Sequence, residues 1–209
     1  MPVAGGNRGR GGAQTTMWRE MAKFGKKLID AGLADSHFGN ISMRVGDRIL
    51  VTRSGSMLDE LDENAIVAVD LKQPTSFDII ASTETNVHRA VYQNTSALAI
   101  IHCHSPFAVA MSMIAEEHLI VPADSESLYV LHEIPLITGG AGSKQLADAA
   151  AKALADHKGA IIRGHGPIAA GKIMEEVYIY ICSIEHACKV KYHVDLARAS
   201  KRDLSAGSP

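Results

Sequence analysis

The sequence predicts a single α/β domain in which helices flank a central mixed or antiparallel sheet. Three observations lead to this prediction. Short apolar runs, such as residues 98–101 and 160–162, end directly in polar loops, as buried strands do. Longer segments with apolar residues at helical spacing lie between these runs. Both hairpin-like and crossover connections join the runs, so the sheet need not be parallel.

The composition fits one globular domain and excludes several classes of function. The chain has 209 residues, of which 46% are hydrophobic, enough to bury a core without help from disulfides or metal. Its 21 basic and 23 acidic residues nearly balance, so no positive field favours nucleic acid. No apolar run reaches the ~18 residues of a membrane helix. Three cysteines without a Cys-x-x-Cys spacing indicate a reducing compartment. We therefore expect a cytoplasmic protein that binds neither nucleic acid nor membranes.

Both ends of the chain are expected to be flexible tails. Residues 1–13 hold five of the 18 glycines and almost no side chain that packs. We predict an N-terminal tail over residues 1–14, a folded domain over residues 15–199 and a C-terminal tail over residues 200–209.

The first half of the domain is predicted to contain two helices and three strands. Apolar residues at helical spacing, with threonines at the start, predict a helix over residues 15–32. Alternating apolar residues around a Gly-Asp turn predict a hairpin over residues 41–51. A strand is expected over residues 66–69, and a second helix over residues 83–94.

The second half is predicted to alternate strands and helices. The expected elements are, in order, a buried strand over 98–101, a helix over 106–113, two short strands within 119–137, an alanine-rich helix over 143–157, a strand over 160–162 and a helix over 174–199. Pro106 suits the first turn of its helix, where its missing N–H costs nothing. We expect the last helix to lie along one edge of the sheet.

Three histidines form the strongest chemical signal. His102 and His104 are two residues apart at a strand end, so both imidazoles point the same way. His165 lies between two glycines just after another apolar strand, where backbones can approach closely. Three imidazoles without a fourth protein ligand are typical of an open catalytic site for zinc, and manganese or cobalt would also fit. An isolated His-x-His pair would equally suit two hydrogen-bonded histidines.

Two other classes of His-x-His site are excluded by the residues that follow the pair. A metallo-β-lactamase-type site would place an Asp soon after the histidines, and residues 105–107 contain none. A cupin would continue in short strands, whereas residues 106–114 have a helical pattern.

Five motifs in order resemble the class II aldolase/adducin family, and most closely its L-fuculose-1-phosphate aldolase branch. The motifs are Gly39-Asn40-Ile41-Ser42, Thr52-Arg53-Ser54-Gly55, Ser82-Thr83-Glu84, His102-Cys103-His104-Ser105-Pro106 and Arg163-Gly164-His165-Gly166. The resemblance covers roughly residues 15–195. It implies a metal-dependent aldolase that reversibly cleaves a ketose 1-phosphate to dihydroxyacetone phosphate and an aldehyde.

The resemblance also implies roles for individual residues. His102, His104 and His165 would bind zinc, and Glu84 would be the acid/base beside it, since a proton must move next to the polarised carbonyl. Glu84 by itself also suits a helix N-terminus, where a carboxylate is favourable. Five small or neutral donors would bind the substrate phosphate: Asn40, Ser54, Gly55, Ser82 and Thr83. Related epimerases carry Asp at position 84, which favours the aldolases. The assembly implied is a homotetramer with sites at subunit boundaries.

The chain departs from the family pattern at two places. A tyrosine donated across the subunit boundary is expected within residues 122–130, where Glu126 aligns with it and Tyr129 lies nearby, so the second proton donor is either residue. The aromatic C-terminal segment of the aldolases has no counterpart after Tyr192. Arg53 either adds charge to the phosphate site or is an exposed strand-edge residue, and His88 lies one helical turn after Glu84, where it would support that residue.

Two alternatives to the aldolase remain open at this point. The same metal site serves decarboxylation or dehydration in relatives with a similar pattern. A non-catalytic module similar to the adducin head would keep the fold without a working metal site, although retention of Glu84 and the three histidines argues against it.

Overall fold

The computed structural model describes residues 10–35 and 37–206, and it has the α/β architecture that the sequence predicts. Its eight strands form one sheet in the order β3-β2-β1-β4-β8-β7-β6-β5. Neighbouring strands are antiparallel except β6 and β7, which are parallel. The strands are β1 (Asn40–Val45), β2 (Arg48–Thr52), β3 (Ile66–Asp70), β4 (Ala99–His102), β5 (Leu119–Ile120), β6 (Ile134–Ile137), β7 (Gly159–Ile162) and β8 (Gly166–Gly171).

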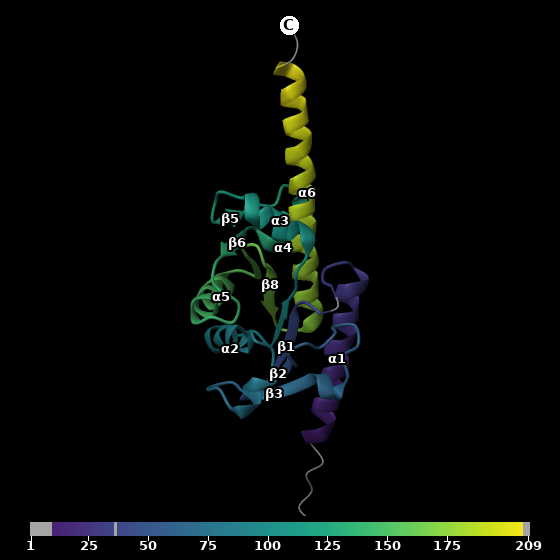
Figure 1. Ribbon diagram of the computed structural model, residues 1–209, viewed down its shortest axis with the longest axis vertical. Helices are drawn as coiled ribbons and strands as arrows, with labels where there is room; N and C mark the ends of the chain where they lie inside the picture. The colour runs from purple at the N-terminus through teal and green to yellow at the C-terminus, as the bar shows by residue number, and fades with distance from the viewer. Residues whose placement is uncertain (1–9, 36, 207–209) are drawn as a thin grey trace, which may run out of the picture.

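Helices cover both faces of this sheet, giving three layers (Figure 1). The α-helices are α1 (Arg10–Asp30), α2 (Thr85–Asn94), α3 (Pro106–Ile114), α4 (Ser125–Leu131), α5 (Lys144–Asp156) and α6 (Met174–Ala206), and the 3-10 helices are η1 (Glu63–Ala65) and η2 (Ser76–Ile79). Helices α1, α3, α4 and α6 share one apolar cluster with the sheet, whereas α2 and α5 pack side by side over the other face.

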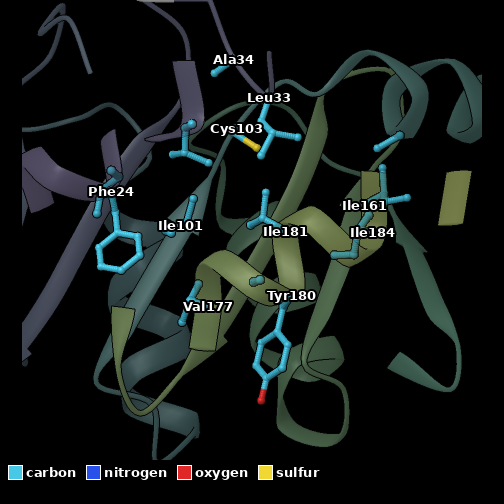
Figure 2. Packing of buried hydrophobic residues seen from close by; sticks show 14 of the residues in the cluster. Phe24, Leu33, Ala34, Ile101, Cys103, Ile161, Val177, Tyr180, Ile181 and Ile184 are labelled. Atoms are coloured by element: carbon cyan, nitrogen blue, oxygen red, sulfur yellow. The ribbon is translucent and has the colours of Figure 1, made fainter. Parts of the chain in front are cut away.

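Helix α6 lies across a face of the sheet, so the predicted position along one edge is wrong. Its buried residues Val177, Ile181 and Ile184 belong to one cluster with Ile101 of β4 and Ile161 of β7 (Figure 2). Apolar residues three and four positions apart form a stripe that only a sheet face is wide enough to cover. The C-terminal part of α6 extends past the rest of the molecule (Figure 1).

The terminal helices are longer than predicted. Helix α1 begins at Arg10, so residues 10–14, predicted as tail, are helical, and α6 continues past residue 199 to Ala206. Helix elongation adds one hydrogen bond for each residue fixed, so a packed helix extends into flanking segments that would not nucleate alone. The rest of the predicted tails, residues 1–9 and 207–209, lies outside the described residues.

Helix α4 and strand β8 were not predicted, and neither were the short 3-10 helices η1 and η2. Helix α4 spans only seven residues, too few for a clear period, and is fixed at its start by the Asp124 carboxylate, which accepts the Ser127 N–H at 2.8 Å. Strand β8 has the sequence GPIAAG, whose glycines and alanines have low strand propensity. Pairing with β4 on one side and β7 on the other forms the strand nevertheless.

The fold places the end of β4 at the centre of the sheet. His102 pairs with Asn40 of β1 on one side and with Ile168 of β8 on the other. Helix α2 starts at Thr85, directly after Glu84. The chain therefore brings four motifs, from β1, α2, β4 and β8, to one end of its central strands.

Candidate active site

The three predicted histidines form a compact nitrogen cluster. One ring nitrogen from each of His102, His104 and His165 lies within 4.8 Å of the other two. The Nε2 atoms of His102 and His104 are 3.1 Å apart. His102 ends β4, and His165 lies in the turn between β7 and β8, so the cluster joins two parts of the chain that are far apart in sequence.

The chemistry of these imidazoles fits a divalent transition metal. His102 Nδ1 donates to the Pro167 carbonyl at 2.9 Å, which leaves the Nε2 lone pair for a ligand. Burial lowers the pKa of His102, and burial together with the other two histidines lowers the pKa of His104 to about 4. Both rings are therefore neutral at neutral pH, the form that binds metal.

Two glycines make the close packing around the histidines possible. Gly39 has φ +98°, and a Cβ there would lie 2.6 Å from the His102 carbonyl oxygen. Gly166 has φ +152°, and a Cβ there would collide with the Cys103 carbonyl and lie 2.9 Å from His104 Cα. Only glycine is free of both the backbone strain and the clash. The loop before β1 and the start of β8 therefore hold the His102–His104 segment from two sides.

The turn that carries His165 is anchored by the arginine of the same motif. The Arg163 guanidinium donates to the carbonyls of Ser112 and Ala115 at 2.8 and 2.7 Å. The Gly164 N–H donates to the Ser112 hydroxyl at 3.0 Å. The arginine thus fixes the turn to the end of α3 and does not face a ligand.

Glu84 is buried among the histidines and does not cap its helix. Its side chain makes no capping hydrogen bond, and only 4% of the residue is exposed. Asn40 Nδ2 donates to Oε2 at 3.0 Å, His102 Nε2 lies 3.3 Å from Oε2, and His165 Nδ1 lies 3.8 Å from Oε1. Oε1 has no hydrogen-bond partner among the described residues. The residue is thus poised toward the nitrogen cluster and has one free oxygen.

The surroundings of Glu84 favour its ionised form. Burial alone raises the pKa of the carboxyl, but His102, the Asn40 amide and His165 together outweigh that effect, so the net pKa is lowered. In its ionised form, the Glu84 carboxylate beside the three imidazoles can accept a proton, as a general base must.

Behind Glu84 lies a buried polar chain that links α2 to β1. His88 Nδ1 and the Ser42 hydroxyl are 2.6 Å apart, and that hydroxyl lies 2.8 Å from the Tyr92 hydroxyl, which donates to the Ser42 carbonyl at 3.0 Å. Burial lowers the pKa of His88 to about 4, so its ring is neutral. His88 Nε2 has no partner within the part of the chain that the structure describes. The chain of hydrogen bonds fixes the first turns of the helix that follows Glu84.

All five residues predicted for phosphate line one cavity of about 190 Å³ together with Glu84, His104 and His165. They are Asn40, Ser54, Gly55, Ser82 and Thr83. The Ser54 and Ser82 N–H groups donate to the carbonyls of Ile80 and Thr52. Among the hydrogen bonds of the described residues, none uses the N–H of Gly55 or Thr83. The cavity therefore offers free backbone donors and small hydroxyls beside the three histidines, a combination suited to an anion.

The remaining lining residues are His37, Phe38, Gly39, Thr52, Arg53, Ser56 and Ala141. Of these, Arg53 is both exposed and part of the lining. Phe38 and Ala141 were not predicted. Ala141 lies in the Gly-Gly-Ala-Gly segment before α5, which the Asn86 amide holds by donating to the Gly142 carbonyl. That run of glycines was a signal for a loop that approaches another backbone closely.

The two candidates for the second proton donor do not reach this cavity within one chain. Glu126 and Tyr129 lie on α4 and line a different surface hollow together with Cys182 and His186 of α6. Tyr129 is 82% exposed. Neither residue is brought to Glu84 by the fold of a single subunit.

None of the helices among the described residues is long and apolar enough to cross a membrane.

Comparison with known proteins agrees with the geometry. Residues 19–192 match the family model of the class II aldolase and adducin N-terminal domain. An L-fuculose phosphate aldolase from Methanocaldococcus jannaschii is 31% identical over 180 residues, which cover 82% of this chain and 93% of that protein. A 3-oxo-tetronate 4-phosphate decarboxylase from Pectobacterium atrosepticum is 27% identical, over 82% of this chain and 81% of its own.

A solved structure has the same fold over nearly the whole chain. The crystal structure of the L-fuculose-1-phosphate aldolase from Thermus thermophilus matches with a TM-score of 0.78 and 28% identity, covering 94% of this chain and 98% of that one. The match of the family model spans the sheet, both helical layers and every residue of the site described above. The chain therefore belongs to the class II aldolase and adducin family, and within it to the enzymes of the lyase class.

Proposed function

We propose that this chain is a metal-dependent aldolase that reversibly cleaves a ketose 1-phosphate to dihydroxyacetone phosphate and an aldehyde. The observation that carries the proposal is the single cavity in which a buried carboxylate, Glu84, lies beside three imidazoles and a set of neutral anion donors. A carbonyl compound with a phosphate at one end would find groups there for both parts: the imidazoles and the carboxylate beside its carbonyl, and the neutral donors at its phosphate.

We assign the metal to His102, His104 and His165, and zinc is our first choice because three neutral imidazoles with an open position suit it. When bound, the metal supplies Lewis-acid chemistry, withdrawing electron density from a carbonyl oxygen. The residues around it fix the ligand set, since the Pro167 carbonyl orients His102 and Arg163 anchors the turn that bears His165.

We assign the proton transfer at the carbon next to the carbonyl to Glu84. In cleavage, the C3–C4 bond breaks and its electron pair stays on C3; the ionised Glu84 first takes up a proton from solvent and then passes it to C3. In the synthetic direction Glu84 removes that proton. Asn40 holds Oε2 at 3.0 Å, so the unpartnered Oε1 is the atom left to face the substrate.

We assign the phosphate to the donors on the loops after β2 and before α2. The free N–H groups of Gly55 and Thr83 would meet phosphate oxygens, with the Ser54 and Ser82 hydroxyls beside them. Because these donors are neutral, they bind the phosphate dianion without forming a buried ion pair. No such pair then has to be separated when the substrate leaves.

The proton of the C4 hydroxyl has no acceptor from the same chain in this scheme. Tyr129 is strongly exposed on α4, so we propose that it serves the cavity of a neighbouring subunit in a homotetramer. Sedimentation of a stable monomer at micromolar concentration would contradict this assembly, and Tyr129→Phe would then leave turnover unchanged.

The test pairs metal analysis with a screen of ketose 1-phosphates. Zinc-loaded protein is expected to hold one zinc per chain and to release dihydroxyacetone phosphate from at least one ketose 1-phosphate. His102→Ala should lose metal and activity together, whereas His118→Ala, outside the cluster, should keep both. Zinc-loaded protein that cleaves none of the ketose phosphates would refute the aldolase.

Decarboxylation is the second candidate, and the decarboxylase from Pectobacterium atrosepticum favours it. Arg53 lines the cavity, and the described residues offer its guanidinium no ion-pair partner, so it is available for a carboxylate. Release of carbon dioxide from a 3-oxo acid phosphate, without dihydroxyacetone phosphate from any ketose, would select this reaction.

A further inference from the structure

One aromatic side chain at the candidate active site has no role in the chemistry described above. Phe38 lies in the loop between α1 and β1 and lines the same cavity as Glu84 and His104. Its N–H donates to the Asp35 carbonyl at 3.0 Å. The next residue, Gly39, packs against the His102 carbonyl. The loop therefore holds Phe38 at the metal cluster.

The ring of Phe38 is stacked on a metal-ligand candidate and yet half open to solvent. Its centroid lies 5.3 Å from that of the His104 ring, and the two planes differ by 14°. The residue is 52% exposed. A ring in this position gains only part of the free energy of burial, so a large apolar surface is left available beside the reacting centre.

Phe38 also stands out from the rest of the cavity wall. Among the described residues that line the cavity, the others are polar, charged, glycine or the single alanine, Ala141. The polar groups on the loops after β2 and before α2 suit the anionic end of a ligand. The apolar surface near His104 suits the other end.

We propose that Phe38 is the specificity-determining residue for the unphosphorylated end of the substrate, and that it selects a terminal methyl or other apolar carbon over a hydroxymethyl group. This inference rests on the proposed aldolase function. A methyl group that packs on the ring is removed from water, whereas a hydroxyl in the same place loses water and finds no partner on the ring. Such a contact discriminates by about 10- to 100-fold.

The first test measures condensation of dihydroxyacetone phosphate with two aldehydes on zinc-loaded protein. The aldehydes are 2-hydroxypropanal and 2,3-dihydroxypropanal, which differ only in a terminal CH₃ or CH₂OH. Wild type should prefer the methyl compound in kcat/KM by about tenfold or more, and Phe38→Ala should bring the ratio to within about twofold. Phe38→Leu, apolar but unable to stack, should keep most of the preference.

A matched control separates this contact from a general loss of an exposed phenylalanine. Phe77 on η2 is 61% exposed and lies outside the lining of the cavity, so Phe77→Ala should leave the ratio unchanged. If Phe38→Ala lowers both rates equally and keeps the wild-type ratio, Phe38 merely supports His104 and the proposal is overturned.

A binding measurement keeps the inference testable apart from the reaction. Calorimetry on zinc-loaded protein would compare hexyl phosphate with 6-hydroxyhexyl phosphate, which have the chain length of a six-carbon ketose phosphate. Wild type should bind the hexyl ester more tightly, and Phe38→Ala should bind both alike. If wild type condenses neither aldehyde, the aldolase function is refuted. The calorimetric comparison still tests whether Phe38 contacts the apolar end of the ligand. Equal preference in wild type and Phe38→Ala overturns the contact whatever the reaction is.

Discussion

At the scale of single residues, the main feature of the candidate active site is Glu84, a buried carboxylate with few hydrogen-bond partners among the described residues. Its Oε2 is held by Asn40, but its Oε1 is buried without a hydrogen bond from the described residues. A buried carboxylate oxygen without a partner is costly, and folded proteins keep such atoms where a ligand completes them. Asn40 Oδ1 and His88 Nε2 likewise have no hydrogen-bond partner among the described residues. Under the proposed function, substrate and metal would supply the partner that Glu84 Oε1 lacks.

Replacing Glu84 with glutamine separates proton transfer from binding. Glu84→Gln keeps the size of the side chain but removes its basicity, so zinc should remain bound while turnover falls by about 10² to 10⁴. Exchange of solvent hydrogen into dihydroxyacetone phosphate should fall with it, because that exchange needs deprotonation and no aldehyde. Glu133→Gln, a carboxylate that pairs with His157 away from the cavity, is the control. Exchange at the wild-type rate in Glu84→Gln would show that another base acts.

At the scale of secondary structure, the ligand segment is a strand end fixed by two neighbouring strands. β4 receives β1 on one side and β8 on the other, and Gly39 and Gly166 allow both neighbours to approach the His102–His104 backbone. The position of the imidazoles therefore depends on two glycines, which have no side-chain donor atom of their own.

Two glycine substitutions test this dependence. Gly166→Ala combines backbone strain with a clash at Cys103 and His104, so it should lower the free energy of unfolding by about 3 kcal/mol or more and weaken zinc binding. Gly46→Ala, in the hairpin turn, has φ +61° but an empty surrounding, so it should cost about 1 kcal/mol and leave zinc binding unchanged. Denaturant unfolding of the metal-free proteins and zinc titration measure both effects. Equal zinc affinities would contradict the role given to Gly166.

The sequence predicted the elements whose patterns are local. The hairpin of β1 and β2, the strand β4 and the helix α5 follow from alternation, an apolar run and helical spacing. Strand β8 and the position of α6 depend on partners from distant parts of the chain, which local patterns do not report. In the candidate site, the order of the motifs along the chain predicted that His102, Glu84 and Ser54 would lie together. Phe38 was missed, because a single aromatic residue in a loop gives no recognisable sequence pattern.

At the scale of the whole molecule, buried histidines link stability to pH. His88 is fully buried, and burial lowers its pKa to about 4, against about 6.5 in an unfolded chain. Between these values the unfolded chain binds more protons than the native protein, so stability falls as pH falls. His102 shifts in the same direction, and the lowered pKa of Glu84 adds a further loss below about pH 4.5.

Unfolding of the metal-free protein across this range checks the contribution of His88. The free energy of unfolding should be nearly independent of His88 above about pH 6.5 and fall toward pH 4, with His88 contributing at most about 1.4 kcal/mol per pH unit. His88→Gln should show a shallower fall, and His118→Gln should follow wild type. Identical slopes in wild type and His88→Gln would mean that His88 titrates normally in the folded protein.

The pairing of β4 with β8 also determines when the metal site comes into existence during folding. An unfolded chain has the neighbouring pair His102 and His104, but His165 joins them only after a long intervening segment has closed and β8 has paired with β4. Long-range pairing of this kind is slow to form. Full affinity for a metal would therefore be reached late in folding, and a metal bound there would chiefly slow unfolding, since it would stabilise contacts that are completed last.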